Sequence, residues 1–364
     1  MLAKVPHKKP ETIAVLDIGS SKVVCLIGQA EPNYGVRLLG AGVGPSEGIK
    51  SGAVVDMDSV ETAIRSAVGK AEREAGVAVQ SVCVNMATRS LRSERLTATT
   101  EFSSGEVAER DVKRLLHSSL AEFTEPDETF LHAIPLSWSV DGEPNIEEPR
   151  GMFGSALDVD MHFVLAGVGP LRNLAHCIER CHLQMKSATA SPYAAGLAVL
   201  TDDERDLGVT VIDMGGGMTT AAIFRDDKLF HVEALSIGGQ TVTNDIARGV
   251  MTPFEAAERI KMIYGSALHG ANDDTEVIPC PPMGAQDLLH NEPRSVLTGI
   301  IRSRTEETFE ILRDRIQDSD LETFAGRRIV LTGGGAQLNG VREVAEYVFN
   351  KRVRIGRPHG VLGL

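Results

Sequence analysis

Two stretches of the chain share one pattern of apolar and polar positions. Residues 13–28 and residues 209–224 each begin with an apolar run, continue through an aspartate, glycine and small hydroxyl residues, and end in a second apolar run. Such a pattern predicts two strands joined by a tight turn. We therefore expect two β-hairpins of the same design, with Asp17 and Asp213 at equivalent positions at the ends of their first strands.

The pattern changes in character between residues 87 and 166. Apolar positions alternate over 91–102, an amphipathic helix is predicted over 106–123, and further strands are predicted over 130–140 and 157–164. We expect an exposed loop at 144–152. This order of strand, helix, strand and strand predicts a small α+β unit inserted into the first half of the chain.

Helices and strands alternate on either side of this insertion. Before it, we expect a strand over 36–43, a helix that begins at a cap on Asp58 or Ser59 and ends near Gly76, and a strand over 79–86. After it, we expect helices over 171–183, 254–265 and 295–316, a helix that starts at Ser191 and another that ends at Gly249. Strands are expected over 185–189 and 229–236, and a surface excursion over 271–292.

The turns of the two hairpins carry the candidate chemistry. Glycines 215–217 leave no Cβ in the way of a phosphate, so successive backbone N–H groups can converge on it, and Thr219 and Thr220 add hydroxyl donors. The Asp213 carboxylate would repel a phosphate unless Mg²⁺ or its water shell lay between them. One such turn could be merely structural, but its duplication predicts two related lobes that face each other across a cleft.

A third glycine cluster strengthens the prediction of a nucleotide site. Residues 329–338 form an apolar strand that runs into three glycines before a helix, an arrangement suited to the nucleoside end of a nucleotide. In this order, the three elements resemble the phosphate-1, phosphate-2 and adenosine motifs of the actin, Hsp70 and hexokinase superfamily. The inserted unit and segments 207–209, 237–247, 255–265, 329–335 and 353–356 resemble the FtsA family of bacterial cell division proteins.

The resemblance implies an α/β protein with an actin-like two-lobed ATPase fold, duplicated β-hairpin phosphate loops and a small inserted subdomain, called 1C in this family. The implied division is a disordered start at 1–11, subdomain 1A at 12–86 and 167–206, subdomain 1C at 87–166, and domain 2 at 207–355, with 2B at about 240–327 and 2A around it. Residues 356–364 are expected to return to domain 1 and to stop before the family's C-terminal membrane anchor.

The expected ligands are ATP and Mg²⁺. The ion is predicted between Asp17, Asp213 and the phosphates, mainly through water, because Mg²⁺ gives up its hydration reluctantly. The resemblance implies that Gly238 and Gly239 approach the sugar and phosphates. It also implies that Glu258 and Lys261 contact the ribose and the adenine edge. The expected nucleotide-binding residues are Asp17, Gly19, Ser20, Ser21, Lys22, Asp213, Gly215, Gly216, Gly217, Thr219, Thr220, Gly238, Gly239, Glu258, Lys261, Gly333, Gly334 and Gly335.

Some of these assignments have structural alternatives. Lys22 could contact the phosphates or be solvated at a hairpin tip. Glu258 and Lys261 could form an ordinary ion pair on a helix surface. The segment 191–200 contains no Glu, Gln or Asp that could position an attacking water. We therefore name no catalytic residue and expect ATP binding with at most slow hydrolysis.

Composition limits the classes of function. The net charge of −13 argues against general nucleic-acid binding, which needs a basic surface. The five cysteines are odd in number and irregularly spaced, which is typical of a reducing cytoplasm rather than a disulfide framework. No apolar stretch reaches about 18 residues, so we expect no membrane-spanning segment. Residues 1–10 lack the apolar core of a signal peptide.

A partner surface is suggested by Arg294, Arg302 and Arg304, which flank the start of the long helix. By resemblance, this region binds the C-terminal tail of the tubulin-like FtsZ, although the arginines and neighbouring glutamates could also form a solvated face. The resemblance implies a protein that polymerises into filaments and binds later division proteins through 1C. It further implies that FtsZ is linked to the cytoplasmic face of the membrane at the division site through the anchor. The alternatives are a PilM-like pilus-assembly adaptor and, less favoured, a sugar or acid kinase.

Overall fold

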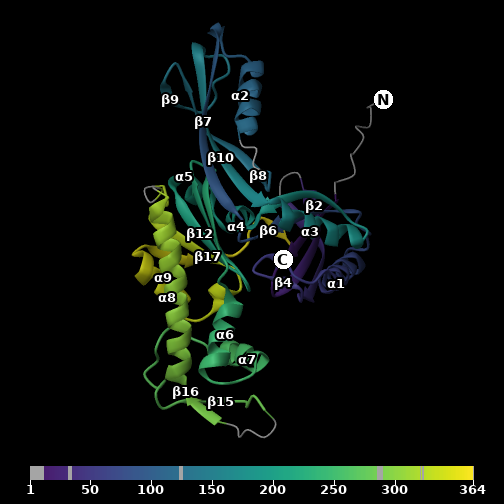
Figure 1. Cartoon of the computed structure of the whole chain (residues 1–364), viewed down its shortest axis with the longest axis vertical. Helices are drawn as coiled ribbons and strands as arrows, with labels where there is room; N and C mark the ends of the chain where they lie inside the picture. The colour runs from purple at the N-terminus through teal and green to yellow at the C-terminus, as the bar shows by residue number, and fades with distance from the viewer. Residues whose placement is uncertain are drawn as a thin grey trace, which may run out of the picture.

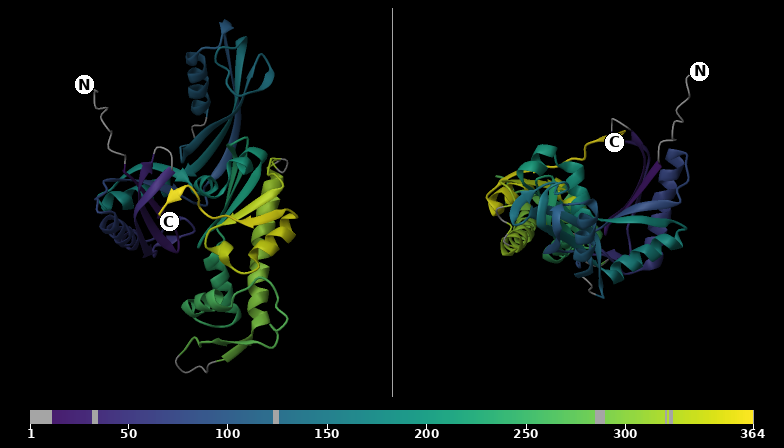
Figure 2. Two further views of the ribbon diagram at one scale, coloured as in Figure 1. Left: turned by 180° about the vertical axis from the view of Figure 1, so that it is seen from behind. Right: turned by 90° about the horizontal axis from the view of Figure 1, so that it is seen from above.

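The computed structural model describes residues 12–31, 35–122, 126–284, 290–319, 321 and 324–363. The expectation for residues 1–11 lies outside these ranges. The molecule is elongated: helix α2 (Glu109–Glu122) and its sheet lie at one end, and the hairpin of β15 (Val277–Cys280) and β16 (His290–Pro293) lies at the other (Figure 1). Two larger sheets lie side by side between these ends (Figure 2). No helix within the described ranges has the length and apolar character needed to cross a membrane.

Lobe 1 is the unit built on a six-stranded sheet of order β11-β6-β1-β2-β3-β19. Its strands are β1 (Thr12–Ile18), β2 (Lys22–Glu31), β3 (Gly35–Pro45), β6 (Ser81–Met86), β11 (Gln184–Ala190) and β19 (Val361–Leu362), and the short pair β4 (Ile49–Lys50) and β5 (Ala53–Val54) follows β3. Helices α1 (Met57–Ala75) and α3 (Val168–Arg180) bury Val60, Ile64 and Ile178 in one core with Leu16 and Val84 of the sheet.

The start of helix α1 differs from the prediction. Its cap is Asp56, whose carboxylate accepts the backbone N–H of Asp58 at 3.0 Å and of Ser59 at 3.4 Å. The prediction of Asp58 or Ser59 as the cap is therefore wrong. Aspartate and serine both favour this position, so only the backbone geometry distinguishes the three candidates. The helix ends at Gly76, which has a φ of 68°, as predicted.

Lobe 2 is the unit built on a five-stranded sheet of order β14-β13-β12-β17-β18. Its strands are β12 (Val209–Met214), β13 (Thr219–Arg225), β14 (Lys228–Leu235), β17 (Arg328–Thr332) and β18 (Arg352–Ile355). Here β12, β13 and β14 form an antiparallel meander, as β1, β2 and β3 do, and β17 and β18 add in parallel, as β6 and β11 do. The duplicated two-lobed architecture expected from the two hairpins is confirmed.

The insertion forms a separate sheet of order β7-β10-β8-β9. Its strands are β7 (Arg92–Glu106), β8 (Glu128–Val140), β9 (Glu143–Ile146) and β10 (Phe153–Gly167). One sheet face packs Trp138, Val159 and Phe163 against Leu115 of α2. Residues 143–146, partly assigned to an exposed loop, instead form the edge strand β9, which pairs with β8.

Helices complete lobe 2 and connect the two lobes. They are α4 (Ser191–Val199), α5 (Asp202–Leu207), α6 (Gly239–Gly249), α7 (Phe254–Tyr264), α8 (Arg294–Asp318), the 3-10 helix η1 (Gly335–Gln337) and α9 (Val341–Phe349). Part of the expected surface excursion at 271–292 forms the hairpin of β15 and β16. The long helix α8 buries Leu297, Ile301 and Phe309 in a core shared with Ile246 and Ile260 of α6 and α7.

In the sequence, the insertion lies between two segments of lobe 1. In the structure, one end of its sheet packs against lobe 2. Its Val164 shares a core with Phe224 and Leu229. Buried His162 contacts the Leu229 carbonyl through Nδ1 at 2.8 Å and the Ser93 hydroxyl through Nε2 at 2.9 Å. A carbonyl oxygen can only accept, so Nδ1–H donates to Leu229 and Nε2 accepts from Ser93.

Candidate functional site

The two predicted hairpins have the same geometry. Ile18 pairs with Val23 and Met214 with Thr219, so four residues, 19–22 and 215–218, form each turn. The first residue of each turn donates its backbone N–H to the carbonyl of the fourth, at 3.1 Å from Gly19 to Lys22 and at 2.8 Å from Gly215 to Met218. The sequence repeat is thus a repeat of the backbone.

The two aspartates occupy equivalent places in the two lobes, each on a strand that has a parallel neighbour in its own sheet. Asp17 lies beside Asn85 of β6, and Asp213 lies beside Thr332 of β17. Burial, together with the charge of Asp17, raises the pKa of Asp213 to about 6. Burial also raises the pKa of Asp17, although a hydrogen bond with Asn85 and the charge of Lys22 oppose this effect. The two carboxylates are thus partly withdrawn from water, and the charge of Asp17 acts on Asp213.

The surroundings of the aspartates suit a hydrated cation. The Thr220 hydroxyl and Asn85 Oδ1 are buried without a hydrogen-bond partner, so both can receive or hold a water molecule. Within the described ranges, no group of three or more His, Cys, Asp or Glu side chains forms a metal site. Two carboxylates alone match an ion such as Mg²⁺, which keeps several waters and takes further oxygens from phosphates.

The turns of the two hairpins touch across the lobes. A Cβ added to Gly217 would lie 2.4 Å from the Ser20 hydroxyl and 3.2 Å from the Ser51 backbone nitrogen, so no side chain fits there. Gln240 of α6 donates its side-chain N–H to the Ser20 carbonyl at 2.9 Å. The expected phosphate loops are therefore brought together, and Gln240, which sequence reasoning did not single out, joins them.

The start of helix α6 holds the second hairpin in place. Gly239 and Gln240 donate their backbone N–H groups to the carbonyls of Gly215 and Gly216, at 3.0 and 2.7 Å. Gly238 is packed so closely on the same turn that an added Cβ would lie 2.6 Å from the Gly216 oxygen. The expected residues Gly238 and Gly239 thus lie directly behind the phosphate loop.

Glu258 and Lys261 form more than a surface ion pair. The Lys261 ammonium donates to Glu258 at 2.7 Å, to the Thr243 hydroxyl at 2.7 Å and to the Gly239 carbonyl at 2.9 Å. Its side chain is only 14% exposed. Thr243 also contacts the Glu258 carboxylate. These bonds attach α7 to the first turn of α6, next to the second phosphate loop.

The third glycine cluster contacts Asp213. Gly333 has a φ of +85°, and an added Cβ would lie 2.3 Å from Asp213 Oδ1. Gly335 packs on Met214, whereas Gly334 is exposed and has open space around its Cα. A 3-10 turn, η1, follows the strand before helix α9 begins. All three predicted motifs therefore meet around the aspartates.

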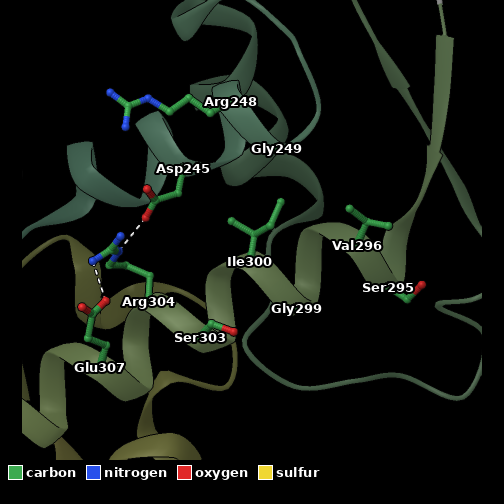
Figure 3. A pocket seen from close by; sticks show the side chains of 10 residues that line it. All are labelled: Asp245, Arg248, Gly249, Ser295, Val296, Gly299, Ile300, Ser303, Arg304 and Glu307. Carbon is green, nitrogen blue, oxygen red and sulfur yellow. Dashed lines mark hydrogen bonds and ion pairs between the residues drawn. The ribbon is translucent and has the colours of Figure 1, made fainter.

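A hollow of about 690 Å³ lies between α6 and α8, away from the hairpins. Figure 3 shows Arg304 turned toward Asp245 and Glu307, with which it forms ion pairs at 2.5 Å. Arg248 points away from both acids and is exposed, without an ion pair in the part of the chain that the structure describes. The residues that line the hollow are Asp245, Arg248, Gly249, Ser295, Val296, Gly299, Ile300, Ser303, Arg304 and Glu307.

Two of the three predicted partner-binding arginines lie outside this lining. Arg302 pairs with Glu306 at 2.8 Å, and Arg294 pairs with Glu276 at 2.9 Å. Sequence reasoning missed Arg248 because only the packing of α6 beside α8 places it at the hollow. The signal that could have found it is its position almost one helical turn after Asp245, on the same helix.

Comparison with known proteins decides the family. The family model "Cell division protein FtsA" matches residues 210–363, and the model "SHS2 domain inserted in FTSA" matches residues 88–165. The FtsA of Rhizobium meliloti (strain 1021) is 43% identical over 100% of this chain and 85% of its own length. The chain belongs to the FtsA family. Two further relatives support this assignment. The FtsA of Neisseria meningitidis is 35% identical over 97% of this chain and 85% of its own length, and the FtsA of Escherichia coli K12 is 30% identical over 96% and 84%.

Solved structures confirm the actin-like fold. The PilM–PilN type IV pilus biogenesis complex matches with a TM-score of 0.67 at 16% identity, over 96% of this chain and 90% of that chain. MreB5 of Spiroplasma citri bound to AMPPNP matches with a TM-score of 0.56 at 12% identity, over 96% and 92%. The PilM likeness extends to the fold alone, whereas the FtsA relatives match in sequence along nearly the whole chain, so the PilM-like alternative is the weaker one.

Proposed function

We propose that this cell division protein binds Mg²⁺·ATP between its two hairpins, polymerises, and links FtsZ filaments to the cytoplasmic face of the membrane at the division site. The observation that carries the nucleotide site is the meeting of Asp17, Asp213 and the two matching turns at one point between the lobes. Two structures of MreB5 of Spiroplasma citri, which have this fold, are bound to AMPPNP and to ADP, which supports the choice of nucleotide.

Each motif has a proposed role in nucleotide binding. The backbone of 19–22 and 215–217 and the hydroxyls of Ser20, Ser21, Thr219 and Thr220 hold the phosphates. Asp17 and Asp213 would hold a hydrated Mg²⁺, which would neutralise phosphate charge. Gly334 offers open backbone to the nucleoside, because no atom lies within 4 Å of the place its Cβ would occupy. Lys261 and Glu258 border the sugar side behind Gly239.

We propose slow turnover for this site. Helix α4, which leads from lobe 1 toward lobe 2, consists of Ser, Pro, Tyr, Ala, Gly, Leu and Val residues. None of these carries a carboxylate or amide side chain that could orient an attacking water. We therefore propose that bound ATP acts mainly by holding the two lobes together, and that its slow hydrolysis determines when the lobes separate.

The hollow between α6 and α8 is our proposed site for the FtsZ C-terminal tail. Such a tail is the end of a disordered segment, so binding would order it against a groove, with cations meeting its acidic groups. Arg248 is available at the rim, whereas Arg304 is already paired with Asp245 and Glu307. Arg302 and Arg294, which have partners of their own, would contribute by long-range attraction.

The division into subdomains follows the same proposal. Lobe 1 corresponds to 1A, the insertion to 1C, and lobe 2 to domain 2, in which α6, α7, α8 and the β15–β16 hairpin form 2B around residues 240–327. We propose that 1C carries contacts with later division proteins and with neighbouring subunits in a filament.

Binding of a fluorescent FtsZ tail peptide, followed by anisotropy, tests the partner site. We expect saturable binding that Arg248→Glu weakens by roughly 10-fold or more, since an ionic hydrogen bond is lost and a repulsion added. The matched control is Arg259→Glu, an identical charge change at an exposed arginine of α7. Equal weakening by both variants would reject the hollow as the site, and no binding to the folded protein would reject the FtsZ link.

A further inference from the structure

One side chain joins the phosphate loop of lobe 1 to lobe 2. Gln240 belongs to α6, and its Nε2 donates to the carbonyl of Ser20 at 2.9 Å. Ser20 lies within the turn 19–22 and is 7% exposed. The bond is partly buried, so water competes with it less than it would at an open surface.

Both ends of this contact are held by other bonds. The backbone N–H of Gln240 is fixed on the Gly216 carbonyl at 2.7 Å, so the side chain starts from the second phosphate loop itself. On the other side, the carbonyl of Ser21, the residue after Ser20, accepts the N–H of Ser46 at 3.1 Å, which anchors the first loop to the segment directly after β3. The Gln240 side chain therefore bridges two loops that are each held by backbone hydrogen bonds within their own lobe.

The chemistry of the contact requires a donor. A backbone carbonyl can only accept, so the amide N–H₂ of Gln240 must face Ser20. A carboxylate of the same shape would point a negative oxygen at the carbonyl and repel it. A thioether of similar length would fill the space without forming the bond.

We propose that Gln240 is a positioning residue that holds the two phosphate loops at the separation in which they close on the phosphates of a bound nucleotide. This inference rests on the proposed nucleotide site and adds the element that couples its two halves. Phosphates gripped from both lobes leave only when the lobes part. Loss of the Gln240 bond therefore speeds nucleotide release and changes the association rate little.

The experiment measures dissociation and association of a fluorescent ATP analogue (mant-ATP) with Mg²⁺ by stopped flow. The variants are Gln240→Met, which keeps size without the donor, Gln240→Ala and Gln240→Glu. Asn244→Ala, at an exposed position of the same helix, is the matched control. We expect dissociation to be faster by roughly 3- to 10-fold in the Met and Ala variants, the range for one neutral hydrogen bond, and faster still in the Glu variant.

The readouts separate positioning from a structural role. A merely structural residue would lower the melting temperature of the ligand-free protein, whereas we expect that temperature to stay within a few degrees in the Met variant. Dissociation rates within twofold of the wild type in both the Met and Glu variants would overturn the proposal while leaving the nucleotide site intact. Absence of saturable mant-ATP binding to the wild type would overturn both together.

Discussion

Acidification should destabilise the junction between the insertion and lobe 2 through His162. The side chain is fully buried, and burial, aided by the nearby charges of His231 and Arg95, lowers its pKa to about 3 even though its hydrogen bond to Leu229 opposes the shift. In the unfolded chain a histidine has a pKa of about 6.5. Between pH 6.5 and pH 3, the unfolded state therefore takes up a proton on this histidine while the folded state does not. The stability that neutral His162 contributes is complete above pH 6.5 and is lost as the pH falls toward 3.

The size of the effect follows from the two pKa values. Between pH 7.5 and pH 5.0, uptake of one proton by the unfolded state alone costs about 2 kcal/mol of folding free energy. The variant His162→Asn keeps an amide N–H where Nδ1 donates to the Leu229 carbonyl, but it cannot be protonated. We expect this variant to be less stable at pH 7.5 and to lose about 2 kcal/mol less than the wild type on acidification.

The assay is urea unfolding followed by the fluorescence of Trp138, the sole tryptophan, which lies in the core of the insertion. Wild type and variant are compared at pH 7.5 and 5.0, so all other titrating groups contribute equally to both. An equal loss of stability in the two proteins would refute the claim that His162 is buried and neutral at this junction.

Two further predictions test local geometry. Gly333→Ala should lower both stability in thermal melts and mant-ATP affinity in binding titrations, because φ is +85° and the new Cβ would collide with Asp213. Gly334→Ala should leave the stability unchanged, because open space surrounds the place of the new Cβ, but it should weaken mant-ATP binding if the nucleoside lies there. Glu204→Gln should destabilise the protein by roughly 1–2 kcal/mol in urea unfolding, since it removes the charge that pairs with the Arg354 guanidinium, which is partly exposed and keeps its bond to the Val199 carbonyl. Hydrogen bonds from Arg354 lower the pKa of Glu204 to about 2, so the wild type alone should lose this contribution as the pH falls from about 4.5 toward 2.

The duplicated hairpins were predictable because their information is local. In each, apolar runs flank a turn of four residues, and the pairing of Asp213 with Thr220 repeats that of Asp17 with Val24. The third glycine cluster was recognisable for the same reason. That all three meet at one point followed only from the duplication and the resemblance, since no local pattern encodes the packing of one lobe on another.

Two kinds of feature escaped prediction: local elements with a weak or ambiguous sequence pattern, and contacts between residues distant in sequence. The edge strand β9 and the hairpin of β15 and β16 are short, and their residues lack a distinct apolar alternation. Gln240 lay inside a segment that carried the resemblance, but its partner, Ser20, is 220 residues away. Arg248 likewise gains its place only when α6 packs beside α8. The cap of α1 was misplaced because Asp56, Asp58 and Ser59 compete within four positions.

The central claim is that the two aspartates and the two turns form one Mg²⁺·ATP site. Isothermal titration of the protein with ATP, in Mg²⁺ and in EDTA, tests it most directly, with the wild type beside Asp17→Asn and Asp213→Asn. The account predicts one ATP per chain, bound more tightly with Mg²⁺, and loss of the Mg²⁺ dependence in both variants. Binding of equal strength with and without Mg²⁺ in all three proteins, or no ATP binding by the wild type, would contradict it.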